Sequence, residues 1–397
     1  MPELFSFLIV ILAGVVFSAV FNRLHLPWVI ALIIGGIAIG PNGLGIFAPN
    51  ETIDFLAEIG LVFLMFMAGL ETRLSSITEL KRDVVRLFLA NALIPFGVGV
   101  GIGILFGFQP LPALLLGIVF IGTSIAVVVP AFEKNRLLHN RLGKTVIGAA
   151  VLSDVLSLTL LSLVVQKTGG AEVFPAYLAY PIAFTALVAA RWAVPLFRDA
   201  IRTRAEEAGD LFEQELRGVF VVLIALVLLF QVLGLHSVIA GFLAGLVLSD
   251  FMTSERLREK LHALSYGLFI PIFFVVIGTK TNLAAFGATA KAPLLVPAVL
   301  IGAMGSKFIS GWFAGRWIGF SKPQSSLIGV ATTPQLITTL AAVAAAGSAG
   351  LLEDHVLAAM VILSIVTTFA APLLIRRYAS RADPAQTPAL PTIVHES

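Results

Sequence analysis

The chain has 397 residues, of which 58% are hydrophobic and 12% are charged. Soluble globular domains carry about 25% charged residues, so this composition excludes an ordinary soluble protein and indicates a chain largely embedded in a bilayer. The net charge is +3. The chain has no cysteine, which excludes disulfides, thiolate metal ligands and cysteine nucleophiles. We expect no nucleic-acid partner, because the basic residues are explained by membrane orientation.

Long apolar runs, separated by Gly, Pro or charge clusters, predict about 13 transmembrane helices. They lie near residues 4–21, 27–40, 53–70, 84–107, 112–130, 143–166, 173–195, 216–233, 236–250, 262–279, 293–319, 325–346 and 354–375. The loops are short, so we expect one all-α polytopic transmembrane domain over residues 1–379 and a short cytoplasmic tail over 380–397.

Lysine and arginine are distributed unevenly between the two sides of this arrangement. All of them except Lys167, Lys280, Lys291 and Lys307 fall in the loops of one side or at the span ends on that side. Positively charged loops face the cytoplasm, so the sequence predicts an outer N-terminus and a cytoplasmic C-terminus. We expect a multi-pass protein of the inner or plasma membrane of a prokaryote, surrounded by lipid.

A faint internal repeat links the second and ninth spans. Val29-Ile30-Ala31 and Gly36 recur as Val238-Ile239-Ala240 and Gly245. The partners are seven positions apart in the order of spans, an odd number, so the two copies would cross the membrane in opposite directions. This predicts an inverted repeat, with repeat 1 over about 1–168, a linker helix and cytoplasmic connector over about 169–215, and repeat 2 over about 216–379. Chance matching among common apolar residues is the alternative.

The fifth and twelfth spans, which the repeat would pair, carry polar residues in their middles. These are Thr123 and Ser124 in the fifth span, and Thr332, Thr333 and Gln335 around Pro334 in the twelfth. Proline removes a backbone donor and disfavours helix at the preceding residue, so we expect a break there. Two opposed broken helices would offer carbonyls and helix ends to an ion, although such hydroxyls often bond only to the preceding turn.

Two ionisable side chains lie deep within apolar runs, Asp154 in the sixth span and Lys307 in the eleventh. Such a group costs about 2.5–3.5 kcal/mol at mid-bilayer, so it marks a candidate functional site. Asp154 could bind either a monovalent cation or a proton, with Ser153 beside it and Ser157 one turn along; the alternative is a structural aspartate. Lys307 could pair with an acid, compete with the cation or carry a proton, or it could snorkel to water.

The six histidines fall in loops, at span ends or in the tail, and there is no HExxH motif. No histidine is placed to hold a metal or to activate an intramembrane nucleophile. We therefore expect neither an enzyme nor a cofactor.

Several strings together are specific, although each alone is weak. They are Leu26-Pro-Trp-Val-Ile, Gly40-Pro-Asn-Gly-Leu-Gly45, the run from Glu58 to Met-Ala-Gly-Leu-Glu71, Gly122-Thr-Ser124, Ser153-Asp154, and Pro271-Ile-Phe-Phe-Val-Val-Ile-Gly278. Over about residues 5–375 the chain resembles the monovalent cation:proton antiporters that include the Nap-type Na+/H+ exchangers and the membrane domain of Kef-type K+ systems. The resemblance implies a Na+/H+ antiporter-like fold of thirteen helices, in which the unwound fifth and twelfth helices cross in a mobile core, and a homodimer.

By the same resemblance Asp154 looks like the carboxylate that binds the transported ion, and Lys307 looks like the core lysine. Thr123 and Ser124 fall on the crossover. Electrogenic members of the family have an Asp-Asp pair at the position of Ser153-Asp154, and its first aspartate pairs with the lysine. This chain has Ser153 there, so Lys307 lacks that partner and could pair with Asp154 instead.

The twelfth span also departs from the family pattern. It reads Pro334-Gln-Leu-Ile337 where relatives carry a Pro-Arg-Gly-Glu-like string. With a single titrating carboxylate, the simplest exchange is one cation for one proton, without net charge. In Kef systems a nucleotide-binding regulatory domain follows the membrane part. We expect no such domain in this chain.

The sequence thus predicts a secondary-active antiporter for Na+ or K+ and protons that works by alternating access, with the cation and the proton competing for Asp154. A Na+-coupled organic-anion symporter of the same fold, a channel and a non-transporting sensor are the alternatives. Residue identities do not fix the choice between Na+ and K+.

Overall fold

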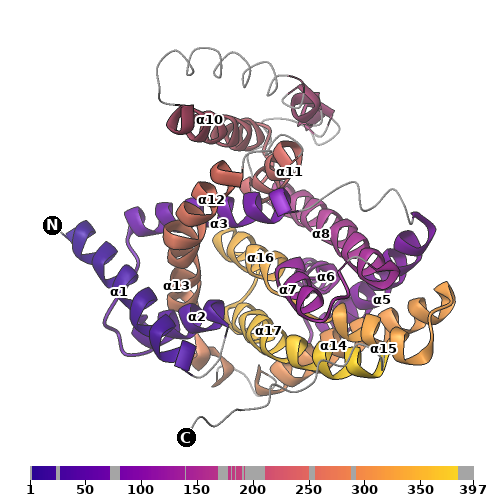
Figure 1. Cartoon of the computed structure of the whole chain (residues 1–397). Coiled ribbons are helices and arrows are strands. Elements are labelled where there is room, and N and C mark those ends of the chain that lie inside the picture. Colours follow the sequence, from indigo (N-terminus) through magenta and orange to yellow (C-terminus); the bar gives the residue numbers. More distant parts are fainter. Residues whose placement is uncertain are drawn as a thin grey trace, which may run out of the picture.

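The computed structural model of the chain is helical throughout its described part (Figure 1). The structure describes residues 2–23, 27–71, 81–138, 140–168, 211–249, 255–287 and 292–382, with short pieces between 178 and 192. The predicted seventh span and the connector after it fall largely outside these residues, as does the tail from residue 383.

The helices of the first half follow one another along the chain. They are α1 (Pro2–Arg23), α2 (Trp28–Ile39), α3 (Glu51–Glu71), α5 (Lys81–Leu105), α6 (Pro110–Ile121), α7 (Ile125–Lys134) and α8 (Arg141–Thr168).

The helices and helical turns of the second half follow in the same way. It contains α10 (Leu211–Val232), α11 (Ser237–Ser249), α12 (Glu255–Leu264), a π-helical turn (Ser265–Phe269), α13 (Ile270–Lys280), a 3-10 turn (Leu283–Gly287), α14 (Ala292–Ile318), α15 (Lys322–Ala331), α16 (Ile337–Ser348) and α17 (Asp354–Ala382).

In the described part, 9 segments are long and apolar enough to cross a membrane, and α2, α11 and α16 are shorter apolar helices. Every predicted span except the seventh corresponds to a described helix or to successive helical segments. Their ends lie within a few residues of the expected positions, except that α12 begins earlier and α17 ends later than expected. The chain is therefore an all-helical, polytopic membrane protein.

The described helices pack in two groups. In the first, which we call the panel group, α3 packs along α11 and α13 along α2, with α1 and α10 beside them. In the second, the crossover group, α5 packs against α6, α8 and α14, and α15, α16 and α17 complete it (Figure 1). Contacts between the groups are sparse and involve mainly α16 with α3, α8 with α11, and the 3-10 turn with α14 and α17.

Glycines bring the panel helices into backbone contact. A Cβ atom at Gly245 of α11 would lie 2.0 Å from a carbonyl oxygen of α3, and one at Gly69 of α3 would lie 2.0 Å from a carbonyl oxygen of α11. Gly36 and Gly278 make the same reciprocal arrangement between α2 and α13. The two glycines matched by the internal repeat, Gly36 and Gly245, both lie at such contacts, because only glycine permits this approach.

Two helices are broken at mid-length, as the sequence predicted. Residues 122–124 separate α6 from α7, and residues 332–336 separate α15 from α16. Proline at position 334 cannot donate to a helical ladder, so the chain leaves the helix there. Each break leaves the end of one half-helix and the start of the next without partners inside the helix.

The two broken segments cross and bond to each other. The Ser124 N–H donates to the Pro334 carbonyl at 2.7 Å, and the Thr123 hydroxyl donates to the Thr332 carbonyl at 3.4 Å. Thr123 and Thr332 are 209 residues apart, the same offset that relates Val29 to Val238. The offset agrees with the predicted inverted repeat, which stays a prediction.

Candidate functional site

Asp154 and Lys307 are the only Asp, Glu, Lys or Arg side chains that are fully buried among the described residues. Asp154 is 6% exposed and Lys307 is 0% exposed. Asp154 lies midway along α8 and Lys307 midway along α14, both in the crossover group. The two groups that the sequence predicted to lie deep in the protein are therefore both there.

The broken end of α6 is capped by side chains from three other segments. The last carbonyls of a helix have no partner within it, and burial makes an unpaired carbonyl costly. The pairs are Ser157 Oγ with the Ile118 carbonyl at 2.9 Å, Gln335 Nε2 with the Phe120 carbonyl at 3.2 Å, and Lys307 Nζ with the Ile121 carbonyl. Predicted polar residues of the core thus serve first to complete this helix end.

Lys307 also serves a second orphaned carbonyl. Its ammonium donates to the Asn91 carbonyl at 3.3 Å. In an α-helix that carbonyl would accept from the N–H four residues on, but residue 95 is proline and has none. A cation at the C-terminal end of α6 is also favoured by the helix dipole. These two carbonyls and the dipole explain why a lysine is tolerated at this depth.

Lys307 does not form a direct ion pair with Asp154, which is one of the partners that the sequence left open. Both side chains are described, and no ion pair within 4 Å joins them. Instead Thr123 lies between them: its N–H donates to Asp154 Oδ1 at 3.2 Å, and its hydroxyl accepts from Lys307 Nζ at 3.0 Å. The ammonium is held away by the carbonyls that the two helix defects leave unpaired.

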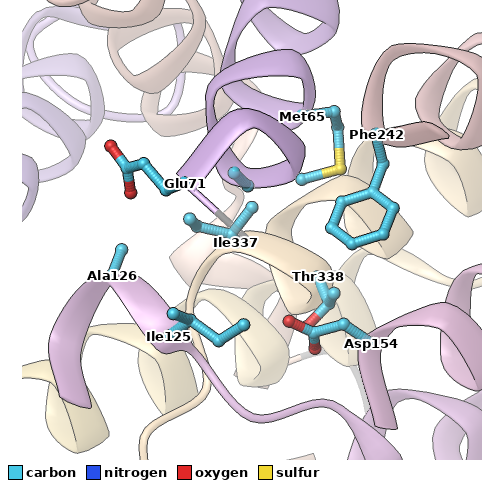
Figure 2. Close-up of a pocket in the computed structure, with 9 residues that line it drawn as sticks. Met65, Glu71, Ile125, Ala126, Asp154, Phe242, Ile337 and Thr338 are labelled. Carbon is cyan, nitrogen blue, oxygen red and sulfur yellow. The ribbon is translucent and has the colours of Figure 1, made fainter. Parts of the chain in front are cut away.

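The Asp154 carboxylate lies in a pocket of about 10 Å³, room for about one water-sized particle. The pocket wall contains Met65, Ala68, Glu71, Phe242, Ile125, Ala126, Ile337 and Thr338 (Figure 2). Ile125 and Ala126 begin α7, and Ile337 and Thr338 begin α16, so the N-terminal ends of both half-helices face the carboxylate. Helix N-termini stabilise negative charge, so this arrangement can keep a carboxylate ready for a cation.

The remaining predicted site residues divide into two kinds. Thr332 and Thr333 donate to the Gly329 and Val330 carbonyls at 2.9 and 2.8 Å, which is the ordinary bond to the preceding turn. Ser124 and Ser153 are both 1% exposed, and their hydroxyl oxygens have no hydrogen-bond partner in the described structure. Those two hydroxyls are therefore available, whereas the threonines mainly close α15.

Sequence reasoning missed several residues around the pocket. Asn91 and Thr338 were not singled out, because each looks like an ordinary residue of an apolar span. Thr338 had a usable signal: it stands four residues after Pro334, in the first turn after the predicted break. Asn91 likewise stands four residues before Pro95.

A second, wider cavity of about 680 Å³ opens between the two helix groups at the end where α3 begins. Its wall includes four acidic residues, Glu51, Asp54, Glu58 and Asp354, together with Lys280 and His236. Asp54 and Lys280 form an ion pair at 2.7 Å. Asp154 does not line this cavity, which shares no lining residue with the Asp154 pocket.

Comparison with known proteins gives relatives along nearly the whole chain. It is 29% identical over 380 residues to the probable Na(+)/H(+) antiporter 3 of Methanocaldococcus jannaschii, covering 94% of this chain and 96% of that protein. It is 28% identical over 364 residues to the Na(+)/H(+)-K(+) antiporter GerN of Bacillus cereus, covering 89% and 90%.

The fold is similar to a solved structure as well. The sodium proton antiporter MjNhaP1 from M. jannaschii at pH 8 superposes with a TM-score of 0.67 at 17% identity, covering 96% of this chain and 98% of that one. The antiporter-like fold expected from the sequence is thereby confirmed. The family described as "Sodium/hydrogen exchanger, transmembrane" matches residues 7–381. With its crossed helix breaks and a buried carboxylate beside them, the chain belongs to this sodium/hydrogen exchanger family.

Proposed function

We propose that the protein is a secondary-active antiporter that exchanges a monovalent cation, Na+ or K+, for a proton at Asp154. One observation carries the proposal: the only fully buried carboxylate of the described chain lies in a small pocket where the starts of two broken helices meet. The similarity to relatives named as Na(+)/H(+) and Na(+)/H(+)-K(+) antiporters supports it.

The exchange follows from one site with two mutually exclusive occupants. The deprotonated carboxylate binds a cation that has shed most of its water, and a proton taken up by the same oxygens releases the cation. The sparse contacts between the panel and crossover groups allow the crossover group to move and expose the pocket to each side in turn. Transport occurs only when the site is occupied, which couples the two ions.

We further propose that the exchange is electroneutral, one cation for one proton. The Asp154 site has the same net charge when it holds a cation as when it holds a proton, because each occupant contributes one positive charge. The movement in one direction therefore cancels the charge moved in the other. Lys307 keeps its proton throughout, since its ammonium is bound to the Ile121 and Asn91 carbonyls and to Thr123. Ser153 supplies no second charge.

The setting of this activity is proposed with it. Loops rich in Lys and Arg would face the cytoplasm of a prokaryotic cell, with the N-terminus outside. The wide acidic cavity would then be the outer approach, and Glu71 would stand at the cytoplasmic edge of the pocket. A homodimer through the panel group, whose α1 exposes many apolar side chains, fits the same scheme.

Organic-anion symport is disfavoured by the same geometry. A pocket of about 10 Å³ holds a small ion but not an organic molecule, and two helix N-termini with a carboxylate form a site for one cation or proton.

The test is proton movement in proteoliposomes loaded with a pH-sensitive dye. We expect Na+ or K+ added outside to drive proton efflux in the wild type and not in Asp154→Asn. Asp83→Asn, which removes a carboxylate paired with Arg141 at 2.7 Å near the surface, is the matched control and should keep its activity. Absence of cation-driven flux in folded wild-type protein would overturn the proposal, and a rate that changes with an imposed membrane potential would overturn electroneutrality.

A further inference from the structure

The side-chain hydroxyl of Thr338, in the Asp154 pocket, forms no hydrogen bond with the backbone. Several other Ser and Thr side chains of the helices donate to a carbonyl of the preceding turn, as Thr145, Thr281 and Thr367 do at 2.7 to 2.8 Å. Thr338 is 4% exposed, and its Oγ1 has no hydrogen-bond partner of ordinary geometry, but it lies close enough to the Asp154 carboxylate to interact with it. An unpaired buried hydroxyl costs about 1–3 kcal/mol, so it requires an explanation.

The helix break accounts for the missing bond. Thr338 is the second residue of α16, so the residue four positions earlier, Pro334, lies in the unwound segment. The Pro334 carbonyl already accepts the Ser124 N–H at 2.7 Å, where the two broken chains cross. The usual acceptor of a helical threonine is therefore engaged by the other half of the crossover.

The free hydroxyl faces Asp154. Both residues line the same pocket, and Figure 2 shows Thr338 next to the Asp154 carboxylate, whereas Glu71 turns its carboxylate away. A Cβ atom at Gly122 would lie 2.3 Å from Thr338 Oγ1 and 3.6 Å from Asp154 Oδ1. Glycine at position 122 thus leaves open the space beside both oxygens.

The other hydroxyls near the carboxylate do not line this pocket or are already committed. The Thr123 hydroxyl accepts from Lys307 at 3.0 Å and donates to the Thr332 carbonyl, and the Ser157 hydroxyl caps α6 at 2.9 Å. Ser124 and Ser153 are unpaired but are not part of the pocket wall. Thr338 is the hydroxyl of the wall that can reach a particle bound at Asp154.

We propose that the Thr338 hydroxyl is a direct oxygen ligand of the transported cation and that Thr338, with Gly122, determines which monovalent cation fits. The inference rests on the proposed exchange and assigns it a ligand from the second broken helix. A hydroxyl suits both occupants: its lone pair coordinates Na+ or K+, and it accepts a hydrogen bond from the protonated carboxyl once the cation has left. The Thr338 oxygen therefore has a partner in either state.

The experiment replaces the oxygen and keeps the shape. Thr338→Val is isosteric without the hydroxyl, Thr338→Ser keeps the oxygen, and Thr339→Val is the matched control. Thr339 is 0% exposed, also has an unpaired hydroxyl, and adjoins Thr338 in α16, but it does not line the pocket. The readouts are the KM for Na+, K+ and Li+ in proteoliposomes and the rise in melting temperature that each cation gives the purified protein.

We expect Thr338→Val to raise the KM for the preferred cation about tenfold, to change the order of preference among the three ions, and to lose most of the cation-dependent stabilisation. Thr338→Ser and Thr339→Val should stay close to the wild type. If the valine variant does not fold, Thr338→Ala serves the same purpose.

Wild-type KM values and wild-type cation stabilisation in a folded Thr338→Val or Thr338→Ala would overturn the inference and leave the proposed exchange intact. An equal effect of Thr339→Val would also overturn it, since the loss would then come from any hydroxyl of α16. A wild type without cation-driven flux would instead refute the proposed function itself, so the two failures are distinguishable.

Discussion

Replacing Lys307 tests whether this buried cation is a structural cap or a moving proton. In the structure its ammonium satisfies the Asn91 carbonyl, orphaned by Pro95, and the Ile121 carbonyl, orphaned by the end of α6. Lys307→Met would leave both unpaired in a buried setting. At about 1–3 kcal/mol for each unsatisfied carbonyl, partly offset by removing a desolvated charge, we expect a net loss of about 3 kcal/mol of stability.

The assay is thermal unfolding of the detergent-solubilised protein, combined with transport by the folded fraction in proteoliposomes. Ser306→Ala is the control, because Ser306 is buried in the same helix and donates only to the Ala303 carbonyl of that helix. The control should unfold near the wild-type temperature. The folded fraction of Lys307→Met should still exchange ions without sensitivity to voltage.

A second substitution isolates the physical cause. Pro95→Ala restores an N–H four residues after Asn91, so it gives that carbonyl a donor within α5. In a double-mutant cycle, Pro95→Ala should recover about 1 kcal/mol of the loss caused by Lys307→Met. Strictly additive effects, or a Lys307→Met variant that is as stable as the wild type but transports charge, would refute the assignment of Lys307 as a cap.

Two further outcomes follow from the packing and from a buried histidine. Gly245→Ala places a methyl group 2.0 Å from a carbonyl oxygen of α3, so it should separate the panel helices and lower the unfolding temperature by several degrees. In the control, Gly305→Ala, the methyl group meets no atom within 4 Å, so the unfolding temperature should not fall. Equal effects of the two substitutions would contradict the close-contact argument. Burial lowers the pKa of His236, just before α11, to about 4, below its unfolded value of about 6.5. The neutral imidazole therefore contributes stability that is complete above about pH 6.5 and is lost as the pH falls toward 4. His236→Asn should flatten that part of the pH–stability curve, and an unchanged slope would exclude His236 as its cause.

The sequence alone determined the membrane class, the ends of nearly all described spans, the two buried ionisable groups and the two helix breaks. These features depend on local quantities. A span requires about 20 apolar residues, a buried charge interrupts such a run visibly, and Pro334, which follows two threonines, lacks the N–H that a helix needs. The family resemblance added the crossing of the two breaks, which the Ser124 and Pro334 contact confirms.

The partners of the polar core were decided only by the tertiary structure. Lys307 bonds to carbonyls 186 and 216 residues away in sequence, and Gln335 caps a helix end 215 residues away. Composition gives no hint of such pairs, because an orphaned carbonyl belongs to the backbone and has no residue type of its own. The resemblance therefore left the partner of Lys307 open, with Asp154 as one possibility, and gave no reason to select Thr338. Which buried polar group is capped and which stays free for an ion is settled by where the two broken helices meet.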